Sequence, residues 1–328
     1  MKLLNTVPEE NIYTIREDSF INLVIDTLNF FFWTRAKKID TVIDLELFSR
    51  FTALLSGFSG AERIVGFHSF YNEGLYRGDF LTHKVAYNNH IHISKNFIAL
   101  INALMDSNGE IPYSKRKISD DEVKLDKAEI LRETVDEVKK IISGKYPEYD
   151  DKKHSLVLIN PNASELLVQR RWPPEYYSEL IKRILNFNKN ILVLITGAPN
   201  EKREAEELKN FANNDRCINF AGSTSFLQLP ALYSISSFMI TNDSGPGHFS
   251  AVTDLKTFVF FGPETPKLYG SLGNSTSIYA KLACSPCVSA SNHRKTPCKN
   301  NKCLQVIKPD DVMKIIEKEL IKISKEGE

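Results

Sequence analysis

The sequence predicts an α/β protein whose strands form parallel sheets. Short segments rich in valine, isoleucine and phenylalanine alternate with longer segments of helical spacing along most of the chain. The 328 residues are enough for two domains. The composition, 42% hydrophobic and 25% charged, is that of an ordinary globular protein, and the net charge of +1 gives no sign of a nucleic-acid binder.

Residues 1–150 are expected to form the first domain. The pattern predicts strand 11–15, helix 19–33, strand 40–44, helix 47–56, strand 63–67 and helix 94–105. The apolar run 20–33 contains polar residues and is too short to cross a bilayer, so we interpret it as an amphipathic helix, with contact to a membrane surface as the alternative. The chain opens without a signal-peptide pattern, which predicts a cytoplasmic protein.

A polar region separates the two expected domains. Residues 120–143 have helical spacing with many Glu/Lys pairs, and residues 144–153 are charged and contain Pro147. We therefore place the domain boundary near residue 150. A second domain is expected over 151–308, followed by a terminal helix over 309–328.

The second domain has a clearer alternation of elements. Its expected strands are 154–160, 190–196, 217–220, 238–241 and 256–261, and its expected helices are 173–186, 201–212 and 226–234. Ligands of doubly wound parallel sheets bind beyond the carboxyl ends of the strands. The residues that directly follow these strands are therefore the candidate site.

The turn after strand 238–241 is the strongest candidate. Asp243, Ser244 and Gly245 lead directly into a helix that carries His248. The first N–H groups of a helix are unpaired and its dipole places partial positive charge there, so this turn predicts a phosphate or diphosphate site. Taken alone, Asp243 could be a helix cap and His248 a packed core residue.

Other strand ends supply residues of matching chemistry. Ser164 and Arg170 follow the first strand, and Glu201 follows the second. Arginine matches the geometry of phosphate oxygens, and a glutamate can accept hydrogen bonds from ribose hydroxyls. Each residue alone could be surface charge or a helix-dipole partner. Because all of them fall at one edge of the predicted sheet, together they indicate a nucleotide or sugar-nucleotide pocket.

Two rival motifs fit less well. Residues 245–250 approximate a GxGxxG fingerprint, but they follow the fourth strand of the domain, which argues against a dinucleotide site. Asp243, Ser244 and His248 are residue types of a hydrolase triad. However, they lack the GxSxG elbow and lie too close together in the sequence.

Five motifs, in this order and spacing, resemble glycosyltransferase family 9, the ADP-heptose:lipopolysaccharide heptosyltransferases. They are NPNAS at 160–164, RRWPPEY at 170–176, TGAPNE at 196–201, TNDSGPGH at 241–248 and FFGPET at 260–265. The resemblance implies a GT-B fold, in which two Rossmann-like domains face each other across a cleft. The second domain would bind the nucleotide-sugar donor and the first the acceptor.

The same resemblance implies roles for individual residues. The implied donor-binding residues are Ser164, Arg170, Glu201, Asp243, Ser244, Gly245 and His248. Glu201 would hold the ribose, and the others would contact the diphosphate. The reaction would invert the anomeric centre by direct displacement without a metal. Heptose or a related sugar would pass from an ADP-activated donor to a lipopolysaccharide-type or other glycan acceptor, at the inner membrane. The alternative is a non-catalytic nucleotide-sugar-binding protein or partner subunit.

The chain departs from the family pattern at its start. Family members begin with a strand and a glycine-rich turn that ends in Gly-Asp, whose aspartate is the usual base candidate, and no such segment is found here. We therefore expect an N-terminally incomplete first domain with open sheet edges, which a homo-oligomer would cover. Asp44 and Glu46 are the nearest substitutes for the base, with acceptor binding or helix capping as their alternative roles.

Four cysteines cluster in the expected loop 284–303. Cys284, Cys287, Cys298 and Cys303 have a pattern that suits structural zinc or iron, although the second pair is spaced more widely than a CxxC motif. Two disulfides or free thiols are the alternatives, and a cytoplasmic location disfavours disulfides. In each case we expect a structural clip. Cys217 stands alone in an apolar strand and is expected to be a buried core residue.

Overall fold

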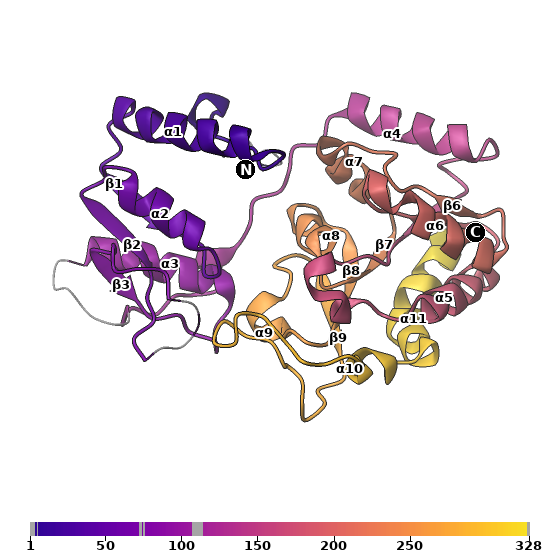
Figure 1. The fold of residues 1–328 in the computed structure, drawn as a ribbon. Coiled ribbons are helices and arrows are strands. Elements are labelled where there is room, and N and C mark those ends of the chain that lie inside the picture. The colour runs from indigo at the N-terminus through magenta and orange to yellow at the C-terminus, as the bar shows by residue number, and fades with distance from the viewer. Residues whose placement is uncertain (1–3, 5, 72–73, 75, 107–113, 327–328) are drawn as a thin grey trace. The chain divides into compact units, whose positions relative to one another are not determined.

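The computed structural model describes residues 4, 6–71, 74, 76–106 and 114–326, which fold into two compact units (Figure 1). The small unit comprises residues from 6 to Lys124 together with Val288–Thr296. The large unit comprises Leu125–Cys287 and residues 297–326, together with Leu4. Each unit contains its own parallel sheet.

The small unit has a three-stranded parallel sheet in the order β1-β2-β3. Its elements are α1 (Phe20–Ala36), β1 (Thr41–Asp44), α2 (Arg50–Phe58), β2 (Arg63–Phe67), β3 (His83–Val85) and α3 (Ile93–Met105). Val65, Phe67, Val85 and Leu100 form its buried core, so β2, β3 and α3 hold the unit together. Strand β3 was not expected from the sequence, because three residues are too few to show an alternating pattern.

The strand expected at residues 11–15 does not form. A short 3-10 helix, Glu9–Asn11, is followed by a segment that contacts α1. The Tyr13 hydroxyl donates to the Asp26 carbonyl at 3.0 Å, and the Arg16 backbone N–H and Nε donate to the Asp26 carboxylate at 2.9 and 2.8 Å. These contacts with a helix take the place of pairing with a strand.

Helix α1 departs from the amphipathic pattern expected for it. It begins after Ser19, whose side chain accepts the Asn22 N–H at 3.2 Å, and Phe30 and Trp33 pack against Tyr13. Six large apolar side chains on this helix are nevertheless exposed: Phe20, Ile21, Val24, Ile25, Leu28 and Phe32. In the described part of the chain, no helix combines the length and apolar character that a bilayer span requires.

The large unit has a six-stranded, fully parallel sheet in the order β6-β5-β4-β7-β8-β9. Its strands are β4 (Ser155–Asn160), β5 (Ile191–Ile195), β6 (Cys217–Asn219), β7 (Phe238–Asn242), β8 (Lys256–Phe261) and β9 (Ser275–Tyr279). Its helices are α4 (Arg132–Lys145), α5 (Pro174–Phe187), α6 (Lys202–Ala212), α7 (Leu229–Ser234), α8 (Gly245–Phe249), α9 (Pro266–Tyr269), α10 (Lys302–Gln305) and α11 (Pro309–Glu326). Strand β9 was not expected, because its outward-facing residues are polar.

Successive residues of β4 belong to two different apolar layers, one on each face of the sheet. Val157 and Ile159 belong to the layer that includes the buried side chains of α5, α6 and α11. Leu156 and Leu158 belong to the layer that includes those of α4 and α7. Helices α5 and α11 lie side by side (Figure 1). Helices on both faces explain why the central strands are continuous apolar runs.

The boundary between the units differs from the expected one near residue 150. Helix α4 buries Val138 and Ile142 in the large unit, so that unit begins at Leu125. The helix expected over 120–143 forms only from Arg132 onward, as α4, and a 3-10 turn, Asp121–Val123, and an extended segment precede it. That segment is tied down by a 2.8 Å hydrogen bond from the Ala128 N–H to the Val252 carbonyl.

Candidate functional site

The strand order of the large unit creates a switch point between β4 and β7. The chain builds β4, β5 and β6 outward in one direction, and then β7, β8 and β9 outward in the other. Doubly wound sheets bind their ligands in the crevice beyond the carboxyl ends of the strands at such a point. A cavity of about 410 Å³ lies there. Its polar lining includes Asn162, Ser164, Glu201, Thr224, Ser225 and Ser244.

Gly197 allows two polar side chains to approach each other at the end of β5. A methyl group at this position would lie 2.8 Å from Glu201 Oε2 and 3.0 Å from Asn162 Nδ2. Glu201 Oε2 also accepts the Ala198 N–H at 2.6 Å, which holds the carboxylate toward the cavity wall. Only a glycine fits between these two side chains. The space that it leaves has a hydrogen-bond donor, Asn162 Nδ2, on one side and an acceptor, Glu201 Oε2, on the other.

A buried carboxylate lies beside the cavity with a nitrogen-bearing side chain on each side, one an arginine and one a histidine. Asp243 Oδ2 is 3.7 Å from Arg170 Nη1, and Asp243 Oδ1 is 3.6 Å from His248 Nε2. The Asp243 side chain is 5% exposed, that of Arg170 14% and that of His248 46%. Asp243 can therefore orient the arginine and the histidine toward an anion, while its own negative charge argues against direct contact with a phosphate.

Two hydrogen-bond donors of this region have no partner. In the described residues, Arg170 Nε and Asn162 Nδ2 are shielded from water and make no hydrogen bond. Leaving a buried donor unpaired costs about 1–3 kcal/mol. A ligand that supplies acceptor atoms at both places would remove that cost.

The helix after Gly245 contributes less than expected. Helix α8 has five residues and continues only as the 3-10 turn Ser250–Val252. So short a helix has a small dipole, and the Gly247 N–H already donates to the Ser244 carbonyl at 3.1 Å. The positive character of the site therefore comes mainly from Arg170.

The structure brings the seven expected donor-site residues to one edge of the sheet. Ser164, Glu201, Ser244 and Gly245 line the cavity, and the Arg170–Asp243–His248 group adjoins them in sequence and in space. The Ser164 hydroxyl accepts the Leu166 N–H at 3.2 Å, so it also caps the 3-10 helix Glu165–Arg170.

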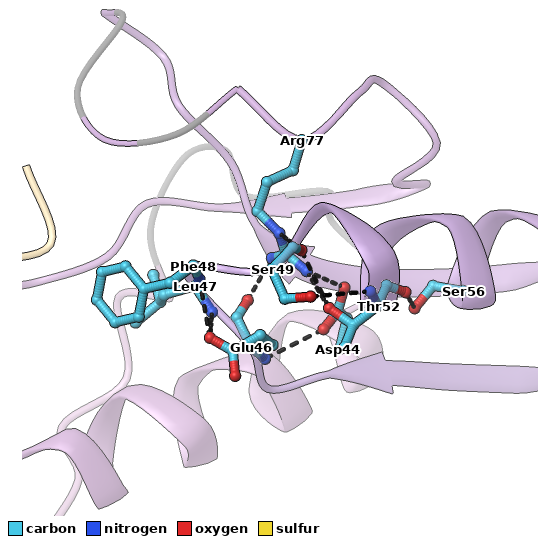
Figure 2. A network of polar contacts seen from close by, with 8 residues as sticks. All are labelled: Asp44, Glu46, Leu47, Phe48, Ser49, Thr52, Ser56 and Arg77. Carbon is cyan, nitrogen blue, oxygen red and sulfur yellow. Dashed lines mark hydrogen bonds and ion pairs between the residues drawn. The ribbon is translucent and has the colours of Figure 1, made fainter. Parts of the chain in front are cut away.

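Asp44 and Glu46, the expected base candidates, lie in the small unit within a network centred on Arg77 (Figure 2). Asp44 Oδ2 accepts Arg77 Nη2 at 2.6 Å, and both side chains are less than one-tenth exposed. Arg77 also donates to the Ser49 carbonyl and to Thr52 Oγ1, at 2.7 Å each. These bonds fix the turn between β1 and α2.

Glu46 makes local bonds in the same turn. Its Oε1 accepts the N–H groups of Leu47 and Phe48 at 2.8 Å each, and its own N–H donates to Asp44 Oδ1 at 3.1 Å (Figure 2). Both carboxylates thus have structural roles, and their assignment as a base stays a prediction. Sequence reasoning missed Arg77 because it lies 33 residues from its partner.

Comparison with known proteins decides the family. Residues 33–297 match glycosyltransferase family 9 (heptosyltransferase). The chain belongs to this family. A lipooligosaccharide heptosyltransferase 2 of Campylobacter jejuni (serotype O:6, strain 81116) is 31% identical over 165 residues, which cover 49% of this chain and 50% of that protein. The lipopolysaccharide heptosyltransferase 2 of Salmonella typhimurium LT2 is 28% identical over 112 residues, 33% of this chain and 32% of that protein. The matched regions thus span about half or less of the curated relatives.

Solved structures of the family share the fold. Escherichia coli ADP-heptose heptosyltransferase II aligns with a TM-score of 0.62 at 16% identity, covering 91% of this chain and 82% of that one. A family 9 glycosyltransferase from Veillonella parvula aligns with a TM-score of 0.65 at 19% identity, covering 94% and 82%. The two α/β units therefore form a GT-B fold, as the family resemblance implies.

Sequence reasoning missed the apolar end of the cavity in this family member. Phe220, Leu229 and Tyr233 line it, and Phe226 and Phe249 meet edge to face at 4.9 Å. Aromatic and apolar side chains of this kind suit a flat heterocyclic base. Phe226 directly follows the loop after β6, and Phe249 ends the short helix α8 that follows β7, so their positions in the sequence could have indicated the site.

The cysteine cluster does not form a metal site in the described residues. None of the five cysteines forms a disulfide bond, and among the described residues no group of three or more His, Cys, Asp or Glu side chains is arranged to hold a metal ion. Cys284, Cys287, Cys298 and Cys303 belong to the large unit, whereas the intervening Val288–Thr296 belongs to the small one. The expected zinc or iron site stays a prediction that this arrangement does not support.

Alkylation of the native chain by iodoacetamide at pH 8 is expected to modify Cys284 first and to spare Cys217 and Cys303. Cys284 is exposed, whereas burial raises the pKa of the Cys217 thiol to about 12 and that of Cys303 to about 11. The thiolate is the reactive form, so the two buried thiols react only after unfolding. Peptide mass spectrometry before and after addition of urea identifies the modified sites. Protection of Cys284 that a chelator abolishes, together with stoichiometric zinc or iron, would contradict this expectation.

Proposed function

We propose that this protein is a glycosyltransferase that moves heptose, or a related sugar, from an ADP-activated donor to a lipopolysaccharide-type glycan acceptor. The cavity between the ends of β4 and β7 supports this most directly. Its volume of about 410 Å³ suits a nucleotide, with aromatic residues at one end and the Arg170–Asp243–His248 group beside the other. The heptosyltransferase relatives support the sugar and the acceptor class.

The chemistry of the residues is consistent with this donor. The apolar end of the cavity would take the base. Glu201 and Asn162, separated by the gap at Gly197, would accept from and donate to ribose hydroxyls. Arg170 would bind the diphosphate and stabilise the negative charge that develops on it when the sugar leaves.

The proposed transfer is an inverting displacement that needs no metal. An acceptor hydroxyl would attack the anomeric carbon while the nucleoside diphosphate leaves, and a carboxylate would take the hydroxyl proton. Asp44 and Glu46 remain the proposed base candidates. Their hydrogen bonds within the β1–α2 turn favour the alternative function, a protein that binds a nucleotide sugar without turning it over.

We also propose that the protein acts in the cytoplasm at the inner membrane. The exposed apolar side chains of α1 support a contact between this helix and another surface, either the membrane or a second copy of the chain. If the cysteine cluster binds zinc or iron, the metal would be structural.

A binding assay followed by a turnover assay tests the proposal. Calorimetric titration with ADP and with ADP-heptose is expected to show binding of both, and UDP serves as the control for base selectivity. Release of ADP is then measured with lipopolysaccharide acceptors that lack the transferred heptose. Binding without ADP release on any acceptor would establish the non-catalytic alternative, and absence of binding would overturn both.

A further inference from the structure

Asn242, the last residue of β7, uses its whole side chain to bind one segment of the chain. Its side chain is fully buried. The amide oxygen accepts hydrogen bonds from the Trp172 backbone N–H and from the Tyr177 hydroxyl, both at 3.0 Å. The amide nitrogen donates to the Pro161 carbonyl at 2.6 Å and makes a longer contact of 3.5 Å with the Asn162 carbonyl.

Three of these partners lie at the two ends of a single loop, and the fourth, Tyr177, lies on α5. The loop leaves the sheet after Asn160, where β4 ends, and returns at Trp172, just before α5. Pro161 is at its first position and Trp172 at its last, so one amide group closes the loop by binding both ends. The loop carries Ser164 and Arg170, two of the residues assigned to the donor site.

The closure acts together with Asn301, whose amide nitrogen donates to the carbonyls on either side of Arg170 at 3.1 and 2.9 Å, to hold Arg170 beside the residue that follows Asn242. Asp243 Oδ2 lies 3.7 Å from Arg170 Nη1, and Arg170 Nε is buried without a hydrogen-bond partner. A flexible loop would let this guanidinium turn outward to be solvated by water. A loop bound at both ends to β7 holds it against Asp243, with an unused donor ready for an anion.

Asparagine is well suited to this position. The amide must donate to one carbonyl and accept from one N–H in a place that water does not reach. An aspartate could accept but not donate, and an apolar residue would leave the Trp172 N–H unpaired. Burial raises the pKa of Tyr177 well above its ordinary value, so that hydroxyl stays protonated and donates.

We propose that Asn242 is a positioning residue of the donor site: its amide clamps the loop 161–172 and thereby presents Arg170 to the diphosphate of the donor. Selectivity for a nucleoside diphosphate over the nucleoside alone then depends on a side chain that touches neither. The inference rests on the proposed function, because it specifies which part of the ligand the loop recognises.

Two variants and a matched control test the clamp. Asn242→Asp removes the hydrogen-bond donor to the Pro161 carbonyl. In Asn242→Ser the side chain is too short to bind either end of the loop. If one variant fails to fold, the other still tests the clamp. Tyr177→Phe removes a buried hydrogen bond to the same Asn242 oxygen but leaves both loop-end bonds in place. Each protein is examined by hydrogen exchange with mass spectrometry and by calorimetry with ADP and with adenosine.

We expect the peptides that cover residues 162–172 to exchange about tenfold faster in either Asn242 variant, while those of the central strands are unchanged. The ratio of ADP affinity to adenosine affinity should fall by about tenfold, which is less than the loss expected when the charge-assisted hydrogen bond of Arg170 is removed altogether. Tyr177→Phe should change neither the exchange of the loop nor the ratio.

Three results would count against the inference. Unchanged exchange of the loop in both Asn242 variants would overturn it, and so would equal losses for ADP and adenosine, since those would indicate a general loss of structure. A Tyr177→Phe protein with the same fall in the ratio would do the same. Failure of the wild-type chain to bind ADP would instead refute the proposed function. Hydrogen exchange of the loop peptides in the Asn242 variants would then still show whether Asn242 holds the loop in place.

Discussion

Replacing Arg170 with alanine is expected to weaken ADP binding by about 30-fold, or about 2 kcal/mol, the loss expected for a hydrogen bond between charged groups. The guanidinium is 14% exposed, lies 3.7 Å from Asp243 and has an unpaired Nε. Without it, the buried Asp243 carboxylate would face the diphosphate uncompensated, which adds repulsion to the lost bond. Isothermal titration calorimetry with ADP and adenosine measures the effect, and adenosine affinity should change little.

A second substitution distinguishes the loss of a charge interaction from a general folding defect, because it should raise the ADP affinity again. In the Arg170→Ala protein, Asp243→Asn should recover part of the ADP affinity, because it removes the negative charge that the arginine had balanced. Arg203→Ala is the matched control, since the Arg203 side chain is 86% exposed and pairs with Glu207 on α6. An ADP affinity that stays unchanged in Arg170→Ala would show that the diphosphate lies elsewhere.

Trp172→Ala is expected to lower the free energy of unfolding of the large unit by about 4 kcal/mol, the usual cost of removing a buried tryptophan. Trp172 is 1% exposed and stacks on Phe260 with a centroid distance of 4.5 Å. Its indole N–H donates to the Ile307 carbonyl at 3.0 Å, which connects the end of the loop 161–172 to the segment before α11. Urea unfolding followed by circular dichroism measures the loss.

The conservative variant separates packing from hydrogen bonding in this prediction. Trp172→Phe keeps a ring against Phe260 and loses the bond to Ile307, so it should cost less than half as much as the alanine variant. Fluorescence is a poor probe here, because the chain has only two tryptophans and one is being replaced. Equal losses for the two variants would mean that packing on Phe260 contributes nothing.

The placement of the candidate donor-site residues at one edge of the sheet could be predicted because its information is local. Asp243, Ser244 and Gly245 follow one apolar strand, and Glu201 follows another, so knowing that the sheet is parallel is enough to place them at one edge. The helix dipole was overestimated for a local reason as well, since nothing in the sequence showed that α8 would have only five residues.

The interactions that hold the site together could not be predicted. Asn242 and Trp172 are 70 residues apart, and Asp44 and Arg77 are 33 apart. Spacing in the sequence carries no information about such pairs, because they depend on which loop passes over which strand end. The segment 11–15 shows the same limit: its residues suit a strand, but Asp26 on α1 binds Tyr13 and Arg16 instead.

The sequence by itself determined that the chain is a parallel α/β protein that resembles glycosyltransferase family 9, and which strand ends carry the proposed donor-site residues. Periodicity and short motifs report the environment of each segment, and those signals are strong where strands are buried on both faces. Only the tertiary structure decided that Arg170 is held against Asp243, that Asn242 closes the loop carrying that arginine, and that Asp44 is paired with Arg77. These are contacts between distant segments, and their energies depend on burial and geometry that exist only once the sheet has formed.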